Sequence, residues 1–473
     1  MAPVHIFGVL FPGAGHAVNL LNVANVIASD DLVMHILCMS SEKAKSWMSS
    51  TGQAFHPNLR LEILAGGLWE TWSEAEPKSV MREIMSPTFA TAVITKIAEV
   101  KAGHDQTHRF SAIILNGLMT TSLVPAARAN NLHVYTLFPS PYYTLRLALA
   151  ARATDGFDHV FRFRGIAERD EDLMFEIGDM PDAIHPMMAK LFAASVELVD
   201  GVILSGTNVA IEGHNYEQPQ MTLELKLPRS TFLIGPLMPN WFSQALEAGV
   251  NQSSRFNTLP ADQAECINFL NKHPVNSVVY ISLGSNADFS VPQALMVISK
   301  LRKFGVPYIM LKRDKKAELV QALGEHTDSG IITEWAPQLD ILAHPSMNCF
   351  LSHGGFGSMM EGIIGGTPFI TCPVASDQFM DSKVMQHMKI SLGSIAVNAH
   401  RFQVDRTDVY PILPDDGGTG IEELFQRLFV LPEGKAALEE ARNNVRLWRR
   451  RIFDARAKEA ARDLATLRQT LLA

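Results

Sequence analysis

Short apolar runs alternate with helix-like stretches along the first 240 residues of the chain. Each run has the length of a buried strand, and strands that alternate with helices predict a parallel sheet with helices on both faces. The segment 142–200 has a mainly helical pattern. The expected strands lie at 4–11, 32–39, 61–64, 112–115, 133–138, 201–205 and 231–236.

The same alternation begins again after residue 262. Residues 238–262 are polar and contain Pro239 and Pro260, which is typical of a linker. The tail 436–472 has Ala, Leu, Glu and Arg at helical spacing. The pattern therefore predicts an α/β protein with two doubly wound parallel-sheet domains. The second set of expected strands lies at 277–283, 307–311, 331–334, 349–352 and 368–371.

Composition narrows the class of protein. The length of 473 residues favours two domains, and 47% hydrophobic against 19% charged residues indicates a well-buried globular protein. The net charge of −8 argues against nucleic acid as the main partner. Four scattered cysteines indicate reduced thiols, and we expect neither a signal peptide nor a membrane span. A cytoplasmic protein is the expectation.

The stretch 335–378 combines an aromatic residue, a glycine-rich turn with a hydroxyl, and spaced polar residues. An aromatic face can stack on a base, and a glycine turn that opens a helix can hold phosphates on its backbone N–H groups. Carboxylates and amides can take the hydroxyls of sugars, so the stretch predicts a nucleotide-sugar site. Taken singly, the same features also fit a core tryptophan, a close-packed turn and solvated acids. The residues are Trp335, Gln338, His353, Gly355, Phe356, Gly357, Ser358, Glu361, Asp377 and Gln378.

His16 is the candidate base. It lies just after the first strand, in the first turn of a helix, where the helix dipole favours the neutral imidazole that can accept a proton. The alternative is a histidine that only packs or caps the turn. The surrounding segment 13–18 also half-matches a dinucleotide fingerprint, but Val18 replaces its third glycine. The acidic run 170–172 is most simply a solvated face, so no metal is expected.

These residues resemble a known family. The ungapped 44 residues from Trp335 to Gln378 are similar to the signature of UDP-dependent glycosyltransferases of the plant secondary-metabolite type, and the resemblance extends to segments 11–16 and 282–285. It implies the GT-B architecture, in which two Rossmann-like domains face each other across a cleft, and an inverting, metal-free transfer. The implied parts are an acceptor-binding domain 1–240, a linker 241–262, a UDP-sugar-binding domain 263–445 and a helix 446–473 that packs back on the first domain.

The resemblance implies a role for each matching residue. Trp335 would stack on uracil and Gln338 would contact the uridine, while Glu361 would take the ribose hydroxyls. The diphosphate would lie at His353, Gly355, Ser358 and Ser285. Asp377, Gln378 and Ser140 would contact the sugar, and glutamine at the last position favours glucose. His16 would deprotonate the acceptor hydroxyl.

Three residues depart from the family pattern. Phe356 replaces a tryptophan, Gly357 replaces an asparagine, and Asn116 replaces the acid that orients the base. An asparagine oxygen can accept the Nδ1–H of His16 but cannot neutralise an imidazolium, which would favour acidic phenols or thiols as acceptors. The alternative is a UDP-sugar-binding or regulatory protein with weakened catalysis.

The resemblance leads us to expect a small lipophilic or phenolic acceptor, which would fit a cleft in the first domain lined by aromatic and methionine residues. The only other expected partner is UDP-glucose, and the chain is expected to be a monomer or weak dimer. The candidate acceptor-lining residues are Trp69, Met85, Phe89, Met119 and Tyr142.

Overall fold

The structure is a computed structural model of the whole chain. The residues it describes are 2–11, 14–51, 54–64, 83–84, 86–138, 195–205, 230–239, 242, 259–284, 287–324, 329–374, 378–396, 409–411 and 419–473. These residues form two compact units. The first contains β1–β7 together with Ile452–Ala473, and the second contains β8–β14 and the following helices up to Arg451.

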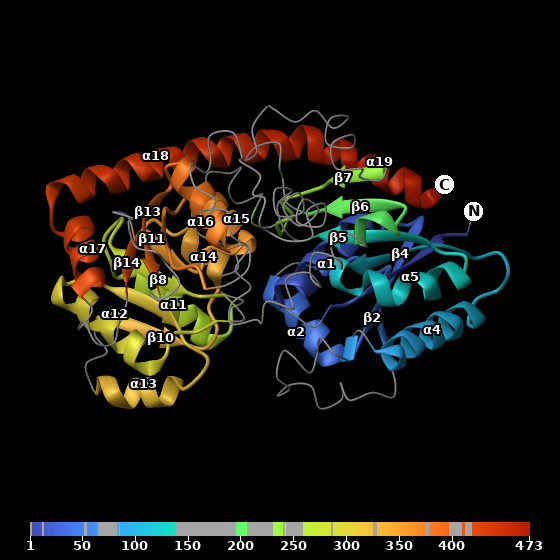
Figure 1. The fold of residues 1–473 in the computed structure, drawn as a ribbon, viewed down its shortest axis with the longest axis horizontal. Helices are drawn as coiled ribbons and strands as arrows, with labels where there is room; N and C mark the ends of the chain where they lie inside the picture. Colours follow the sequence, from blue (N-terminus) through green and yellow to red (C-terminus); the bar gives the residue numbers. More distant parts are fainter. Residues whose placement is uncertain are drawn as a thin grey trace, which may run out of the picture. The chain divides into compact units, whose positions relative to one another are not determined.

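The first unit is built on a seven-stranded parallel sheet with the order β3-β2-β1-β4-β5-β6-β7 (Figure 1). In this order β1 and β4 are neighbours at the point where the chain reverses direction across the sheet, which is where parallel α/β sheets bind ligands. The strands are β1 Val4–Val9, β2 Leu32–Cys38, β3 Leu59–Ile63, β4 Arg109–Asn116, β5 His133–Phe138, β6 Gly201–Leu204 and β7 Ser230–Leu233.

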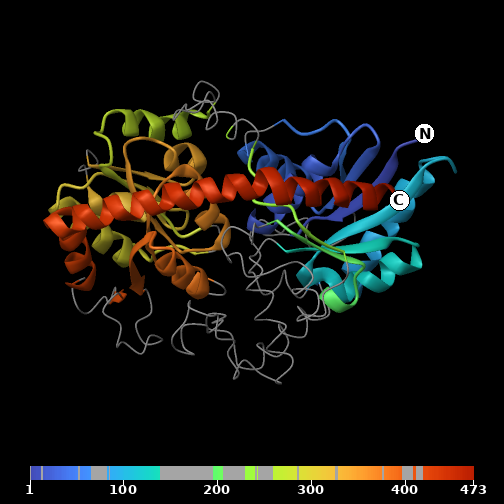
Figure 2. The ribbon, with the colours of Figure 1, turned by 90° about the horizontal axis from the view of Figure 1, so that it is seen from above.

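Helices cover both faces of this sheet because the strands are apolar on both sides. Ile6 of β1 packs with one group of helices, whereas Phe7 and Val9 pack with the other. In Figure 2 the red C-terminal helix α19 runs over the strands of this sheet. The first group is α1 Ala14–Ile27, α2 Ser41–Thr51 and α19 Ala461–Leu472, and the second is α4 Pro87–Ala102 and α5 Thr120–Ala129.

The second unit repeats the strand order of the first as β10-β9-β8-β11-β12-β13-β14, again fully parallel. On one face of the sheet, a core cluster includes side chains of α12, α13, α17 and α18. On the other face, Phe350 and Phe369 lie next to each other, and Phe369 packs against α15. The strands are β8 Val278–Ser282, β9 Tyr308–Leu311, β10 Gly330–Thr333, β11 Met347–Ser352, β12 Phe369–Thr371, β13 Ser391–Ala396 and β14 Val409–Pro411.

The helices of the second unit follow its strands in the usual α/β alternation. The long helix α18 continues through a π-helical turn, η7, into α19, so the chain ends in the first unit. The helices are α11 Ala261–Asn271, α12 Val291–Lys303, α13 Lys316–Leu323, α14 Gln338–Leu342, α15 Phe356–Gly365, α16 Gln378–His387, α17 Thr419–Phe429 and α18 Pro432–Ala455, while η7 Arg456–Ala460 belongs to the first unit.

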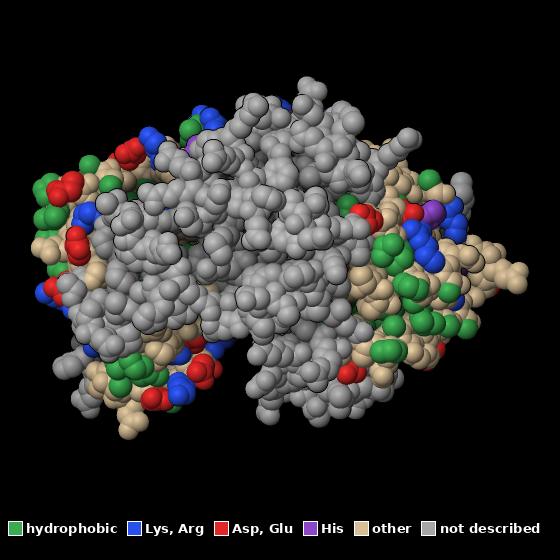
Figure 3. All heavy atoms as spheres, in the orientation of Figure 1, with side chains coloured by type: hydrophobic (Ala, Val, Ile, Leu, Met, Phe, Trp, Pro, Cys, Tyr) green, Lys and Arg blue, Asp and Glu red, His purple; other side chains and the backbone are tan. Residues whose placement is uncertain are grey.

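The predicted fold class, two Rossmann-like parallel-sheet domains, is confirmed. The sequence pattern missed β13 and β14, the outer strands of the second sheet. Among the described helices, none is long and apolar enough to cross a membrane. On the face drawn in Figure 3, acidic and basic side chains are interspersed over the described surface, in keeping with the modest net charge.

Candidate active site

His16 and Asn116 are brought together by the strand order. α1 begins just after β1, so His16 lies in its first turn, and Asn116 is the last residue of β4. Because β1 and β4 are parallel neighbours, their carboxyl ends meet at the same edge of the sheet. The ring centroids of His16 and Phe11 are 4.8 Å apart. Burial lowers the pKa of the His16 imidazole to about 4. The imidazole is therefore neutral at physiological pH.

The side-chain amide of Asn116 has two partners. Its Oδ1 accepts a hydrogen bond from the backbone N–H of Leu118 at 3.1 Å, as the cap of the 3-10 turn η2 (Gly117–Met119). Its Nδ2 lies 2.8 Å from His16 Nδ1 and can only donate. Turning the amide over would set its NH₂ group against the Leu118 N–H, so the backbone fixes the orientation.

This arrangement reverses the hydrogen bond expected from the sequence. The Asn116 oxygen is occupied by Leu118 and does not accept from His16. His16 Nδ1 must therefore be the acceptor, which puts the proton of the neutral ring on Nε2. A ring in this form presents a donor at Nε2, whereas a general base that acts through Nε2 needs its lone pair there.

In the second unit, the candidate nucleotide-sugar-binding residues follow the carboxyl ends of the strands. Trp335 comes after β10 and is 40% exposed, so part of its ring is open to a planar ligand. The Arg313 guanidinium lies 5.9 Å from the Trp335 ring centroid and donates to the Gly284 carbonyl at 2.5 Å. Arg313 thus adds a positive charge between the loops that follow β8, β9 and β10.

Gln338 and Glu361 form a connected pair at this edge. Gln338 Nε2 donates to a carboxylate oxygen of Glu361 and lies 3.5 Å from the Ser358 hydroxyl, while Tyr280 donates to Gln338 Oε1 at 3.1 Å. Burial raises the pKa of Glu361 to about 7, although the Gln338 hydrogen bond works in the opposite direction. Glu361 can therefore take up or release a proton near neutral pH, and hydroxyl donors would favour its charged form.

His353 lies between two glycines. A Cβ on Gly284 or Gly355 would approach its Nε2 to 2.5 or 2.6 Å, so these positions leave room only for hydrogen. Gly355 is the residue that precedes α15, whose first N–H groups and dipole favour an anion. His353 Nδ1 is buried without a protein hydrogen-bond partner, and burial together with Arg313 lowers the pKa of the ring to about 4. The N–H of a neutral imidazole at this place can donate a hydrogen bond to a bound phosphate group.

The remaining candidates have different positions. Gln378 begins α16, and its Oε1 accepts from the Val374 N–H at 2.8 Å. Phe356 is buried and Gly357 is exposed on α15. Phe89 and Met119 are fully buried in the core of the first unit, and their acceptor contacts stay a prediction. The candidates outside the described residues are Ser140, Ser285, Asp377, Trp69, Met85 and Tyr142.

Sequence reasoning did not select Tyr280 or Arg313. Arg313 could have been found from its place, because it follows an expected strand at the same edge of the sheet as His353 and Trp335. Tyr280 lies inside an apolar run and is fully buried, so only its hydrogen bond to Gln338 reveals a contribution to the site.

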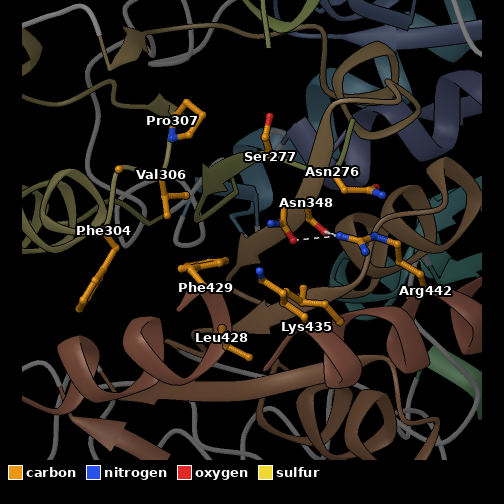
Figure 4. A pocket seen from close by; sticks show the side chains of 12 residues that line it. Asn276, Ser277, Phe304, Val306, Pro307, Asn348, Leu428, Phe429, Lys435 and Arg442 are labelled. Carbon is orange, nitrogen blue, oxygen red and sulfur yellow. Dashed lines mark hydrogen bonds between the residues drawn. The ribbon is translucent and has the colours of Figure 1, made fainter. Parts of the chain in front are cut away.

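A pocket of about 350 Å³ lies at the other end of the second sheet (Figure 4). Its lining includes Ser277 and Pro307, which precede β8 and β9, and the Asn348–Arg442 pair, which is joined by a 3.0 Å hydrogen bond. None of the nucleotide-sugar candidates lines it, so this pocket is separate from the candidate site.

Comparison with known proteins shows what the chain is similar to. Residues 215–407 match the family model described as UDP-glucoronosyl and UDP-glucosyl transferase. The chain is 25% identical over 465 residues to UDP-glycosyltransferase 84B1 of Arabidopsis thaliana, covering 94% of this chain and 92% of the relative. It is 33% identical over 189 residues to UDP-glycosyltransferase 73C6 of the same plant, covering 37% of each.

Solved structures agree with this at the level of the fold. A UDP-glucosyltransferase from Polygonum tinctorium superposes with a TM-score of 0.74 at 20% identity, over 100% of both chains. UGT71G1 of Medicago truncatula, solved with UDP-glucose, gives 0.69 at 17% identity, over 100% of this chain and 99% of that one. With its GT-B fold, its match to the UDP-glycosyltransferase family model and these relatives, the chain is similar to plant-type UDP-glycosyltransferases and is a glycosyltransferase enzyme.

Proposed function

We propose that this enzyme transfers a sugar, with glucose as the first candidate, from a UDP-sugar to a small lipophilic or phenolic acceptor with inversion at the anomeric carbon. The neighbour from Polygonum tinctorium is described as glucosylating indoxyl, which supports a small aromatic acceptor here. The four cysteines are buried and free, which supports a reducing, cytoplasmic location.

In this proposal, the UDP-sugar binds at the edge of the second sheet formed by the carboxyl ends of its strands. Uracil would stack on the open part of Trp335, and the ribose hydroxyls would donate to Glu361, which Gln338 holds in place. The diphosphate would meet the first N–H groups of α15, His353 and Ser285. Charge that builds up on the leaving UDP would be stabilised there without a metal ion. Asp377, Gln378 and Ser140 are the proposed sugar contacts.

The acceptor chemistry follows from His16. In the transfer, the acceptor oxygen forms a bond to the anomeric carbon while the bond from that carbon to the UDP oxygen breaks. A neutral alcohol must lose its proton to a base, but Nε2 of His16 carries a proton in the arrangement that Asn116 fixes. An acceptor that is already an anion needs no base and can instead accept a hydrogen bond from Nε2–H. We therefore propose acceptors that are present as anions at or near neutral pH, such as acidic phenols, thiols or carboxylic acids.

The observation that carries this function is the Gln338–Glu361 pair beside the exposed Trp335, in a chain similar to this family. Incubation with UDP-glucose and phenols of graded acidity, followed by mass spectrometry, tests it. We expect a glucoside whose rate of formation rises with acceptor acidity. Aliphatic alcohols that react as fast as acidic phenols would contradict the proposed acceptor class.

A second candidate function is UDP-sugar binding without efficient transfer. The orientation of Asn116 favours it, because that orientation removes the base from Nε2. Thermal stabilisation by UDP, with no product from any ionisable acceptor, would establish this alternative. A glucoside that forms with the wild-type chain and is lost in His16→Ala, with UDP stabilisation retained, would exclude it.

A further inference from the structure

Four histidines and a glutamate gather in the first unit away from the proposed transfer site. His5 lies on β1, His35 on β2 and Glu62 on β3, while His104 and His108 flank the turn between α4 and β4. His5 is near the start of its strand, and His108 directly precedes Arg109, the first residue of β4. The eight residues of β4 span roughly 25 Å at about 3.3 Å each, so the cluster is remote from Asn116 at the other end.

Three of these side chains have the geometry of a metal site. The ligand nitrogens of His5, His104 and His108 all lie within 4.8 Å of one another. His5 Nε2 is 2.9 Å from His108 Nδ1, and the His104 ring centroid is 4.6 Å from that of His5. Ligands of tetrahedral zinc, at Zn–N distances of about 2.0–2.1 Å, stand about 3.3 Å apart. The His5–His108 pair would therefore move slightly apart and the longer separations, of up to 4.8 Å, would shorten around an ion.

Hydrogen bonds behind the ligands aim their lone pairs at the shared space. Glu62 Oε1 accepts from His35 Nδ1 at 2.8 Å, which leaves His35 Nε2 to accept from His5 Nδ1 at 2.8 Å. His5 Nε2 then carries a lone pair, which accepts from His108 Nδ1 at 2.9 Å in the metal-free protein, so a bound ion would replace that proton. His104 Nδ1 similarly donates to the Val100 carbonyl at 2.8 Å and leaves its Nε2 free. Carboxylate and carbonyl partners behind imidazoles are the usual support of histidine ligands.

The cluster is also held in shape without an ion. His5 and His35 are each 1% exposed, and burial of this kind favours a neutral imidazole over a charged one. A neutral imidazole is the form that binds metals. The turn that carries the other two ligands is fixed, because Asp105 Oδ1 accepts from the Thr107 N–H at 2.9 Å and Asp105 O accepts from the His108 N–H at 3.2 Å.

We propose that His5, His104 and His108 form a binding site for a divalent transition metal, with zinc as the first candidate. Three imidazole nitrogens suit zinc, copper and nickel rather than magnesium or calcium. His104 and His108 are half-buried, so solvent can supply a fourth ligand. The charge of Glu62 offsets that of Arg60 nearby. The ion would tie β1 to the α4–β4 turn and stabilise the first unit, with no part in sugar transfer.

The experiment uses the full chain without a histidine tag, stripped of metal and titrated with zinc by calorimetry. We expect one zinc per chain and a Tm that rises by several degrees. Replacing zinc with cobalt should give visible absorption bands of a tetrahedral, nitrogen-ligated ion. His104→Ala and His108→Ala should each weaken zinc binding by at least about tenfold. His387→Ala, which removes an exposed histidine at the end of α16, should bind zinc as the wild type does.

Two results would overturn the proposal: no stoichiometric zinc binding by the wild-type chain, or binding unchanged in both His104→Ala and His108→Ala. Loss of zinc in His16→Ala, with no loss in those two variants, would place the ion at the transfer site and would also reject the cluster. Circular dichroism of each variant separates lost binding from lost folding. Because no UDP-sugar or acceptor is present, the result does not depend on the proposed function.

Discussion

At the scale of single residues, one atom of Asn116 decides what His16 can do. If His16 acts as a base through Nε2, its Nδ1 carries the proton. The Asn116 side chain would then face two hydrogen-bond donors, the Leu118 N–H and the His16 Nδ1–H. A carboxylate could accept both, whereas the amide offers one oxygen, which Leu118 uses. The amide nitrogen then imposes the tautomer with its proton on Nε2. The acid of the family pattern is therefore needed for its second acceptor atom as well as for its charge.

Asn116→Asp should therefore convert His16 into an effective base. The carboxylate would accept from both donors, leave a lone pair on Nε2 and stabilise the imidazolium that forms. We expect kcat for aliphatic alcohol acceptors to rise by about 10- to 10⁴-fold, the range over which orienting acids act in comparable dyads. Acidic phenols should gain much less. Steady-state rates with both acceptor classes measure the difference, and an equal gain or no gain for the two classes would refute the tautomer argument.

Glu361 should make donor binding depend on pH. Ribose hydroxyls donate best to the carboxylate, and the pKa of the free enzyme's Glu361 is raised to about 7. Binding that requires the charged form should weaken as pH falls through 7, by roughly tenfold between pH 8 and pH 6. Calorimetric Kd values for UDP across this range provide the measurement.

Glu361→Gln is the control for this pH dependence. The variant keeps the shape of the side chain but has no proton to exchange, so it should bind UDP more weakly at pH 8. Any pH dependence that remains in it belongs to the phosphate of UDP. If wild type and variant changed in parallel between pH 6 and pH 8, Glu361 would not be the titrating group.

Sequence reasoning reached the site residues through their places in the fold. His16 and His353 were considered because each follows a strand, and the carboxyl ends of parallel strands meet at one edge of a sheet. Asn116 was selected because the resemblance aligns it with the acid that orients the base. The direction of the Asn116 hydrogen bond could not be predicted from the sequence, because it depends on a backbone N–H in η2 that no side-chain pattern reveals. The histidine cluster was missed because its members come from separate elements, and only His104 and His108 have a close spacing.

At the scale of elements, the sequence located the inner strands and missed two outer ones. Continuous apolar runs mark strands buried on both faces, and β1, β2, β8 and β11 are all of this kind. β13 is interrupted by Gly393, and β14 has three residues and ends in Pro411. Such segments owe their conformation to the neighbouring strand rather than to their own pattern, so periodicity cannot identify them.

Two glycines in and before α15 should respond oppositely to alanine. In Gly355→Ala the new methyl would stand 2.6 Å from His353 Nε2, so the ring must move. We expect a lower Tm and a UDP affinity reduced by about tenfold or more. A Cβ on Gly357 meets nothing within 4 Å, and alanine is favoured over glycine in a helix by up to about 1 kcal/mol, so Gly357→Ala should raise Tm slightly.

Thermal unfolding of both variants, with and without UDP, distinguishes these outcomes. Gly357→Ala acts as the matched control, because it makes the same chemical change two residues further along the chain. Equal Tm values for the two variants would show that the space around His353 is not as restricted as the distances require.

At the scale of the whole molecule, the same strand order occurs twice, but the chain does not complete its first unit before starting the second. Ile452–Ala473 belongs to the first unit. There Asp463 accepts from the Leu233 N–H at 2.9 Å, and the Ser111 hydroxyl donates to the Leu471 carbonyl at 2.9 Å. The first unit is therefore built from the last 22 residues of the chain together with its N-terminal part.

Leu467 tests whether α19 forms part of the core of the first unit. Its side chain is fully buried in the core cluster that also contains residues of α1 and β1, so Leu467→Ala should lower the free energy of unfolding by about 2–5 kcal/mol. Leu472→Ala makes the same substitution on the same helix at a side chain that is 37% exposed, and should cost less than about 1 kcal/mol. Urea unfolding followed by circular dichroism gives both values. Similar small costs for the two variants would mean that α19 lies on the first unit without forming part of its core.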